Sequence, residues 1–446
     1  MPLEWQAGDE TVELLRTLLR FDTRNPPGNE RQAAEFLVDL FTKEGIEARA
    51  LEAAQGRLQV YARLKGSGKK RPVMLLAHTD VVGVERESWS CDPFEGVVRD
   101  GYVYGRGAID DKGMLAANAM AMLLLNRKMK SGKTELARDV VFIATADEEA
   151  GGEWGMGWLV KNHPELLDVE FALNEGGRTR IIEGGRRYLA IQSAEKISHV
   201  VTVTAHGSAG HSAVPLPDNA IFALARAMAR IGAHVEPLHL TKITRNFFAG
   251  LAEIWPDKVI GGAMRELVSN DDAIVQRAAE IVSRIPVFNA GIRAGISATV
   301  VNAGKQFNVI PAVASAVLNV RTIPGQRIED VVERVRVAVN DAAIDVAITS
   351  SGPEAPASDA ASEMFSALAD AARSLDPEIA VVPYLSNGVT DSARLRLLGV
   401  NAYGILPFPM PQADEERMHG HDERIPIESL QFGARLIYET LETITR

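Results

Sequence analysis

Cysteine is almost absent from this sequence. Cys91 is the one cysteine among 446 residues. A lone thiol can form neither a disulfide framework nor a cysteine-based zinc site. Any metal that this chain binds is therefore expected to have histidine and carboxylate ligands.

Basic residues are too few for a bulk nucleic-acid binder. The 48 lysines and arginines face 59 aspartates and glutamates, which gives a formal net charge of −11. With no cationic excess to displace counterions from phosphates, we expect no binding to nucleic acid. The remaining composition, 46% hydrophobic and 24% charged, is typical of a globular protein of two or three domains.

Long apolar runs are missing too. The longest uncharged stretch, residues 197–217, is rich in Ser, Thr, Gly and Pro and contains three histidines, which excludes a membrane span. Residues 1–10 include Glu4, Asp9 and Glu10 and lack an apolar core, so we expect no signal peptide. These features predict a soluble, cytoplasmic protein without membrane partners.

Nucleotide-binding and serine-hydrolase motifs are also lacking. A dinucleotide fingerprint could begin at Gly105, but Asp110 stands in place of its third glycine. A phosphate-binding loop could end at residues 132–134, but Arg127 replaces its first glycine. No G-x-S-x-G elbow occurs. Nucleotide-dependent and α/β-hydrolase chemistry are therefore disfavoured.

Helical and strand patterns alternate in the first part of the chain, as in a mainly parallel α/β sheet. The same pattern resumes after residue 352. The helices are expected at 11–20, 30–45, 113–129, 362–374, 391–398 and 427–444, and the strands at 72–77, 140–145, 171–173 and 379–383.

A second pattern separates these two parts. Its order is β-α-β-β-α-β, which is that of a ferredoxin-like sandwich. The stretch 235–290 is extra material within this order and has no predicted place. We therefore expect an α/β domain made of residues 1–196 and 353–446, interrupted by a smaller α+β domain at 197–352. The strands of the smaller domain are expected at 199–205, 297–302, 314–320 and 344–349, and its helices at 218–231 and 328–339.

Polar residues recur where the predicted strands of the first part end. They occur at 78–80, 110–111, 147–149 and 174–175. Taken singly, each carboxylate is explained as well by helix capping or by a solvated helix start. Because ligands of open α/β sheets lie beyond the carboxyl ends of strands, the four groups together predict a common site. One histidine with several carboxylates suits one zinc ion, or two ions bridged by a carboxylate.

Three of these groups, with two further motifs, resemble the co-catalytic zinc aminoacylase/carboxypeptidase family, over nearly the whole chain. The family includes aminoacylase, carboxypeptidase S, carnosinase and succinyl-diaminopimelate desuccinylase. The resemblance implies a zinc-peptidase catalytic domain with an inserted lid and dimerisation domain. The motifs are His78-Thr79-Asp80, Gly105 to Gly113, Asp147-Glu148-Glu149, Gly210-His211-Ser212 and His419 to Ile425.

The resemblance also implies a set of metal ligands. His78 and Glu175 would hold one zinc ion. Glu149 and His419 would hold the other. Asp110 would bridge the two ions, which cobalt or manganese could replace.

Further roles follow from the same resemblance. Glu148 would be the general base that takes a proton from the zinc-bound water. Asp80 would accept the other ring N–H of His78 and fix its tautomer. Asp111, adjacent to Asp110, is an alternative for the bridging carboxylate.

The inserted domain is expected to contribute substrate contacts. His211 matches a histidine that reaches the active site of a neighbouring subunit, which implies a homodimer; a strand-end histidine with a purely structural role is the alternative. Asn308 and Arg321 match positions that contact the substrate, and Arg suits a carboxylate because its fork binds bidentately.

The sequence as a whole predicts a dizinc metallohydrolase of the carboxypeptidase or N-acyl-amino-acid deacylase type. It would release an amino acid with a free carboxylate from N-acyl amino acids or short peptides. A carnosinase-like dipeptidase is the near alternative. A non-catalytic metal-binding interaction module is the alternative from another class, and the presence of Glu148 argues against it.

Overall fold

Short, fully apolar runs form the centre of the largest sheet. In the computed structural model, which describes residues 7–446, strands β3 (Val73–His78), β6 (Val140–Thr145) and β7 (Phe171–Asn174) pair in parallel. Strand β17 (Asn401–Gly404) continues the sheet in parallel to β7. Every residue of β3, β6 and β7 is buried, because helices cover both faces of the sheet.

Antiparallel strands extend this sheet on both sides. Next to β6 lie β2 (Arg57–Leu64) and then β1 (Glu47–Ala54). Within residues 7–446 the sheet has ten strands, and its central part is parallel, so the predicted α/β class is confirmed. On the other side follow β9 (Arg187–Glu195), β8 (Arg178–Ile181) and β18 (Met410–Pro411), while β16 (Ala380–Ser386) pairs with β9.

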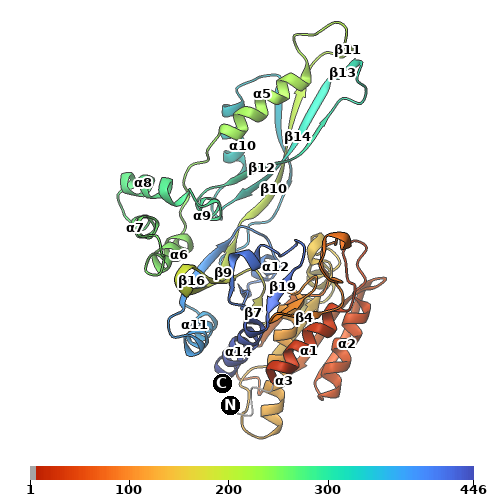
Figure 1. Ribbon diagram of the computed structural model, residues 1–446, viewed down its shortest axis with the longest axis vertical. Coiled ribbons are helices and arrows are strands. Elements are labelled where there is room, and N and C mark those ends of the chain that lie inside the picture. The colour runs from red at the N-terminus through yellow and green to blue at the C-terminus, as the bar shows by residue number, and fades with distance from the viewer. Residues whose placement is uncertain (1–6) are drawn as a thin grey trace.

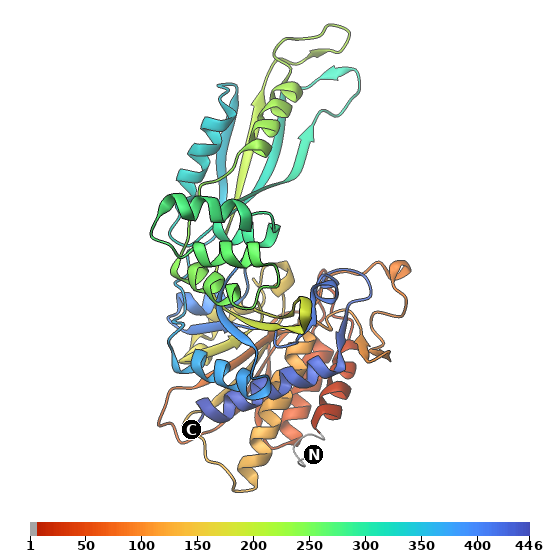
Figure 2. The ribbon, with the colours of Figure 1, turned by 60° about the vertical axis from the view of Figure 1, so that its left-hand side comes forward.

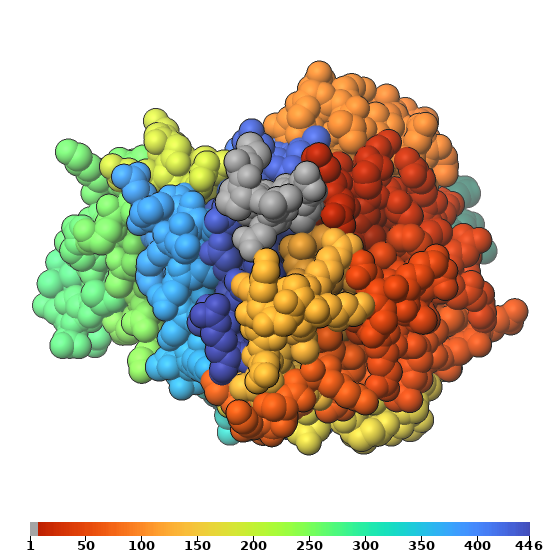
Figure 3. Space-filling model, turned by 90° about the horizontal axis from the view of Figure 1, so that it is seen from below, coloured from red at the N-terminus to blue at the C-terminus, as the bar shows by residue number. Residues whose placement is uncertain are grey.

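Two layers of helices cover the large sheet. Successive side chains of β3 point to opposite faces, so Leu75 packs in one apolar core and Leu76 in the other. Seen from below, atoms of the N-terminal helices, of α3 and of α14 form one continuous face (Figure 3). One layer contains α1 (Ala7–Leu19), α2 (Arg31–Lys43), α3 (Lys112–Lys130), α11 (Glu363–Leu375) and α14 (Ile427–Ile444); the other contains α4 (Met156–Asn162) and α12 (Ser392–Leu397).

A separate four-stranded sheet extends away from the large one (Figure 1). Its strands are antiparallel in the order β12-β14-β10-β15, which is the predicted ferredoxin-like order. The sheet and its two helices bury an apolar core of their own. The elements are β10 (Ile197–His206), α5 (Ala220–Ala233), β12 (Gly295–Ala303), β14 (Val313–Thr322), α10 (Ile328–Val339) and β15 (Ile344–Ser351).

Two very short strands mark the far end of this unit. Strand β11 (Gly210–His211) pairs with β13 (Val309–Ile310) in a two-stranded sheet. Figure 1 shows this pair at the top of the molecule, at the opposite end from α1 and α14.

The stretch that the sequence left unplaced forms four helices, which we call the helical insertion: α6 (Lys242–Ala252), α7 (Lys258–Glu266), α8 (Asp272–Val282) and α9 (Pro286–Ile292). Their apolar side chains pack on the large sheet at Tyr188, Ala190 and Val382. The insertion therefore lies between the two sheets, as the green helices of Figure 2 show.

Three short strands form a further small sheet, and one short helix follows the large sheet. Strands β4 (Val97–Arg99), β5 (Tyr102–Tyr104) and β19 (Arg424–Pro426) form an antiparallel sheet, and α13 (Gln412–Glu415) follows β18.

No helix in residues 7–446 combines the length and the apolar character needed to cross a bilayer. Glu4, used above for the opening segment, lies outside the described residues.

Candidate metal centre and active site

The predicted site residues lie where the strands of the large sheet end. His78 is the last residue of β3, and Glu175 directly follows β7. Glu148 and Glu149 begin a single 3₁₀ turn two residues after β6 ends. Since β3, β6 and β7 are parallel, their carboxyl ends meet at one edge, and these side chains converge there.

Asp110 lies between two histidines. Its Oδ1 is 2.9 Å from Nε2 of His78, and its Oδ2 is 3.1 Å from Nε2 of His419. The two oxygens of one carboxylate thus face two different imidazoles. This is the arrangement that a carboxylate shared between two metal ions requires.

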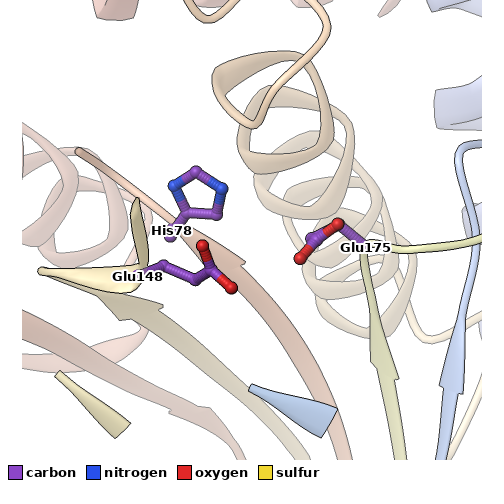
Figure 4. A group of neighbouring side chains, drawn as sticks. All are labelled: His78, Glu148 and Glu175. Carbon is purple, nitrogen blue, oxygen red and sulfur yellow. The ribbon is translucent and has the colours of Figure 1, made fainter. Parts of the chain in front are cut away.

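Two sets of donor atoms share His78. His78, Glu148 and Glu175 form one set, and their carboxylates and imidazole point toward a common space (Figure 4). His78, Asp110 and Glu149 form the other, and in each set the ligand atoms lie within 4.8 Å of one another. Oε1 of Glu149 is also 3.2 Å from Nε2 of His419. The structure thus brings together all five predicted ligands, with Glu148 beside them.

The chemistry of this donor set fits divalent cations. Within the described part of the chain, Asp110, Glu149 and Glu175 form no ion pair with a lysine or an arginine. Several carboxylates are therefore crowded together with only imidazoles to offset their charge. Histidines with carboxylates are ligands that zinc accepts, so the residues fit two metal ions.

The same crowding shifts the pKa values of these groups. Burial, together with the charge of Glu175, raises the pKa of Glu148 well above its usual value. Burial and the charge of Asp110 likewise raise the pKa of Glu175. Hydrogen bonds to Asp110 and Glu149 raise the pKa of His419 to about 10. Each of these raised pKa values is the change expected in a site with excess negative charge.

Asp80 contacts His78 through both its main chain and its carboxylate. Nδ1 of His78 lies 2.9 Å from the main-chain oxygen of Asp80 and 3.5 Å from its carboxylate. The carboxylate also accepts the main-chain N–H groups of Glu148, at 3.1 Å, and Glu149, at 3.2 Å. An Nδ1–H that donates to the carbonyl leaves Nε2 of His78 free as a ligand.

A buried network that the sequence did not reveal holds the turn before Glu148. Arg57 pairs with Glu30 and with Asp147, each at 2.9 Å. Asn25 donates from Nδ2 to Asp147 at 3.1 Å and to Asp80 at 2.8 Å. Asp147 has a left-handed φ of 68°, so these contacts keep an uncommon backbone conformation in place. Of these residues, Arg57, Glu30 and Asn25 lie outside every motif of the sequence.

Glu423 ties the C-terminal histidine segment to the turn that holds Asp110. Its carboxylate accepts the main-chain N–H groups of Ile109, at 2.7 Å, and Asp110, at 3.1 Å, and it pairs with Arg106. His419 reaches Asp110 from this segment, whereas the half-exposed His421 lies 3.8 Å from Glu85.

Asp110 and its neighbour Asp111 have different contacts in the structure. Asp111 is fully buried, and its Oδ2 accepts the main-chain N–H of His78 at 3.3 Å. It belongs to neither set of donor atoms. Asp110 is therefore the carboxylate that faces both histidines.

Three predicted substrate residues lie outside the cluster. His211 is exposed on β11, and Asn308 accepts the Ser212 N–H at 3.1 Å near the same end of the four-stranded unit. Arg321 lies on β14 and donates to Asn319 at 2.9 Å, while its Nη1 is buried without a hydrogen-bond partner in residues 7–446. Within one chain, none of the three lines the cavity next to the cluster.

That cavity has a volume of about 480 Å³. It begins at the cluster, where Glu148, Glu175 and His419 line it, and continues beneath the helical insertion. Acid–base groups, candidate metal ligands and a closed space for a small molecule thus occur at one place.

Comparison with known proteins places this arrangement in a family. The model of the peptidase family M20/M25/M40 matches residues 74–443. The human N-fatty-acyl-amino acid synthase/hydrolase PM20D1 is 30% identical, over 83% of this chain and 74% of its own length. Human aminoacylase-1 is 26% identical, over 93% of this chain and 90% of its own.

Solved structures share the fold. A metallo-carboxypeptidase from Sulfolobus solfataricus superposes with a TM-score of 0.70 at 20% identity, over 98% of this chain and 99% of that one. The YXEP protein of Bacillus subtilis, described as a dinuclear metal-binding peptidase, gives 0.62 at 16% identity, over 99% of both chains. The chain therefore belongs to peptidase family M20/M25/M40, a family of metal-dependent hydrolases.

Proposed function

We propose that this protein is a dizinc amidohydrolase that releases an amino acid with a free carboxylate from N-acyl amino acids or short peptides. The position of Asp110 between His78 and His419, at the mouth of the cavity, is the observation that carries the proposal. The curated relatives support the substrate class, since they are named for N-acyl-amino-acid chemistry.

The proposed ligands divide into two sites. His78 and Glu175 would hold one zinc ion, Glu149 and His419 the other, and Asp110 both. When bound, two zinc ions polarise a carbonyl group and lower the pKa of water.

Glu148 is the proposed general base. Its carboxylate lies within 4.8 Å of the donor atoms of His78 and Glu175 in the lining of the cavity, and its main-chain N–H donates to Asp80, which fixes the backbone of the turn. It would accept a proton from the attacking water and pass it to the amine that leaves.

Arg321 is the proposed partner of the substrate carboxylate. Its Nη1 is buried and has no hydrogen-bond partner in residues 7–446, and burial lowers the pKa of the side chain. An anion would satisfy this donor. Asn308 would add an amide contact.

Removing the base tests the mechanism. Glu148→Gln is expected to lower turnover by about 10²–10⁴-fold while the zinc content stays that of the wild type. Glu153→Gln, an exposed change in the segment between this turn and α4, is the matched control and should leave turnover unchanged. The assay is the release of free amino acid from a panel of N-acyl amino acids and dipeptides, with and without chelator. Near-normal turnover of zinc-replete Glu148→Gln would refute the mechanism.

A homodimer that shares its sites is a further part of the proposal. His211 lies far from the cluster of its own chain, and its Nδ1 accepts the Ala213 N–H at 3.1 Å, which leaves Nε2–H as a donor for an oxyanion. Large apolar side chains are exposed on the same four-stranded unit, such as Phe222 (65%), Val301 (63%) and Phe307 (99%). The edge strand β12 and helix α5 could form an isologous contact.

Subunit mixing tests the shared site. Two inactive variants, His211→Ala and Glu148→Gln, should regain activity when mixed, because one site of the mixed dimer has both residues intact. A mixture that demonstrably exchanges subunits yet stays inactive would contradict sharing through His211, as would a fully active monomer.

A further inference from the structure

We infer that the helical insertion and strands β8, β9 and β16 form an acyl-binding pocket that selects substrates with long apolar acyl groups. The inference rests on the proposed function, since it assigns the acyl half of the substrate to the cavity at the same centre.

One end of the cavity is formed by the metal-binding candidates, and much of the remaining wall is apolar, with Arg178, Arg180, Glu415 and several uncharged polar residues among it. The volume of about 480 Å³ lies within the range of roughly 300–1,000 Å³ of small-molecule pockets and exceeds what an acetyl group needs. Its apolar walls include Phe247, Phe248, Val287, Phe288, Tyr384 and Met418.

These walls are fixed by packing. The ring of Phe247 lies 5.5 Å from that of Tyr384, and the ring of Phe248 lies 5.5 Å from that of Phe288. Trp255 packs against Phe288 from the other side, at 5.1 Å. Because the three phenylalanines are buried, the pocket exists before a ligand enters it.

Charge decides which half of the substrate enters. Apart from His419, the cations of the cavity are Arg178 and Arg180, and both pair with Glu415, at 2.6 and 2.8 Å. The two guanidiniums share this one carboxylate, so each already has an anionic partner, whereas Nη1 of Arg321 is buried without a hydrogen-bond partner in residues 7–446. The amino-acid half of the substrate brings a carboxylate of its own. That half is better served by Arg321, outside the cavity, so the apolar pocket remains for the acyl group.

Gly291 offers a way to fill this pocket. It lines the cavity from α9, and a Cβ built on it has no heavy atom within 4 Å. A leucine at this position would occupy the pocket without displacing its neighbours. Gly262, on α7 of the same insertion, is equally open but does not line this cavity, so it provides a matched control.

The test is a series of straight-chain acyl groups from acetyl to dodecanoyl on one amino acid. In the wild type, kcat/KM should rise about two- to fourfold per added methylene until the chain fills the pocket. Gly291→Leu should lower the octanoyl-to-acetyl ratio of kcat/KM by about tenfold or more. Gly262→Leu should leave the ratio unchanged.

A binding measurement separates this inference from the proposed function. Octanoate, titrated calorimetrically, should bind to the wild type and to Gly262→Leu but not to Gly291→Leu, and acetate should bind to none of them more tightly than octanoate does. If no N-acyl amino acid is hydrolysed but octanoate shows this pattern, the proposed function fails and the pocket stands.

Two results would overturn the inference. One is a flat chain-length series, or a Gly291→Leu enzyme with the wild-type ratio. The other comes from a second series, in which the acyl group is kept constant and the leaving amino acid is varied. If Gly291→Leu alters only the preference for the amino-acid side chain, the cavity receives the amino-acid half of the substrate.

Discussion

Asp110 joins the two halves of the proposed centre, because its oxygens face His78 from one strand end and His419 from the C-terminal segment. These two histidines differ in what holds them in place. His78 is fixed through Nδ1 and is buried, whereas the side chain of His419 is half-exposed and depends on Glu423 for the position of its segment. The proposed second metal site is thus the more dependent on distant contacts.

The two C-terminal histidines should behave differently. His419→Ala is expected to lose about one zinc ion per chain, since His419 lies 3.2 Å from Glu149 and 3.1 Å from Asp110. His421→Ala should keep the full zinc content, because His421 lies 3.8 Å from Glu85 and belongs to neither set of donor atoms. Metal analysis of the purified variants measures this directly. The reverse result would move the ligand to His421.

Arg57 is expected to matter for stability. Arg57→Met leaves the buried carboxylates of Glu30 and Asp147 without their cation, which should cost about 3–5 kcal/mol. Arg31→Met, which removes a half-exposed arginine paired with Glu52, is the control and should cost about 0–1 kcal/mol. Urea denaturation of both variants tests the difference. Equal losses would show that the network around Asp147 does not stabilise the fold.

The sequence predicts the cluster better than its supports. His78, Glu149 and Glu175 lie at or shortly after the ends of parallel strands, which meet at one edge of the sheet, so local patterns suffice to place them. Asp110 follows a turn after β5, and it is the motif from Gly105 to Gly113 that marks it. Arg57 lies in no motif, and Glu423 lies in the C-terminal motif without its role being evident there, since they act on residues 90 and more than 300 positions away. Their roles depend on tertiary contacts, which patterns of single residues do not encode.

For whole helices, α6 to α9 likewise show that tertiary contacts cannot be read from the sequence pattern. Their N-terminal caps Thr241, Asp257 and Asp271 are visible in the sequence and accept main-chain N–H groups in the structure. What the sequence does not show is where these short helices dock. Docking follows from the match of their apolar faces to β9 and β16, and it is this docking that closes the cavity.

The approach of α6 to the sheet leaves no room for a side chain at Gly250. A Cβ there would lie 2.3 Å from Cγ1 of Val382, so Gly250→Ala should destabilise the protein by about 1–3 kcal/mol. Gly262→Ala, in open space on α7, should instead stabilise it by roughly 0.5–1 kcal/mol, because alanine favours a helix. Thermal or urea unfolding distinguishes the two signs. A neutral Gly250→Ala would mean that α6 can shift without cost.

The whole molecule combines two sheets with separate cores, and the chain passes between them near Lys196 and Gly352. The predicted division at residues 196/197 and 352/353 remains a prediction, supported by these separate cores. The helical insertion belongs in sequence to the inserted unit but packs on the large sheet. Residue ranges alone therefore do not describe which parts form the substrate cavity.

Activity measured during zinc titration tests the central claim most directly. The protein is stripped with a chelator, and zinc is added back in steps while release of amino acid from the best N-acyl amino acid is followed. The account predicts no activity without metal and a maximum near two zinc ions per chain. Undiminished hydrolysis by the metal-free protein, or no hydrolysis of any N-acyl amino acid or peptide at full zinc loading, would contradict it.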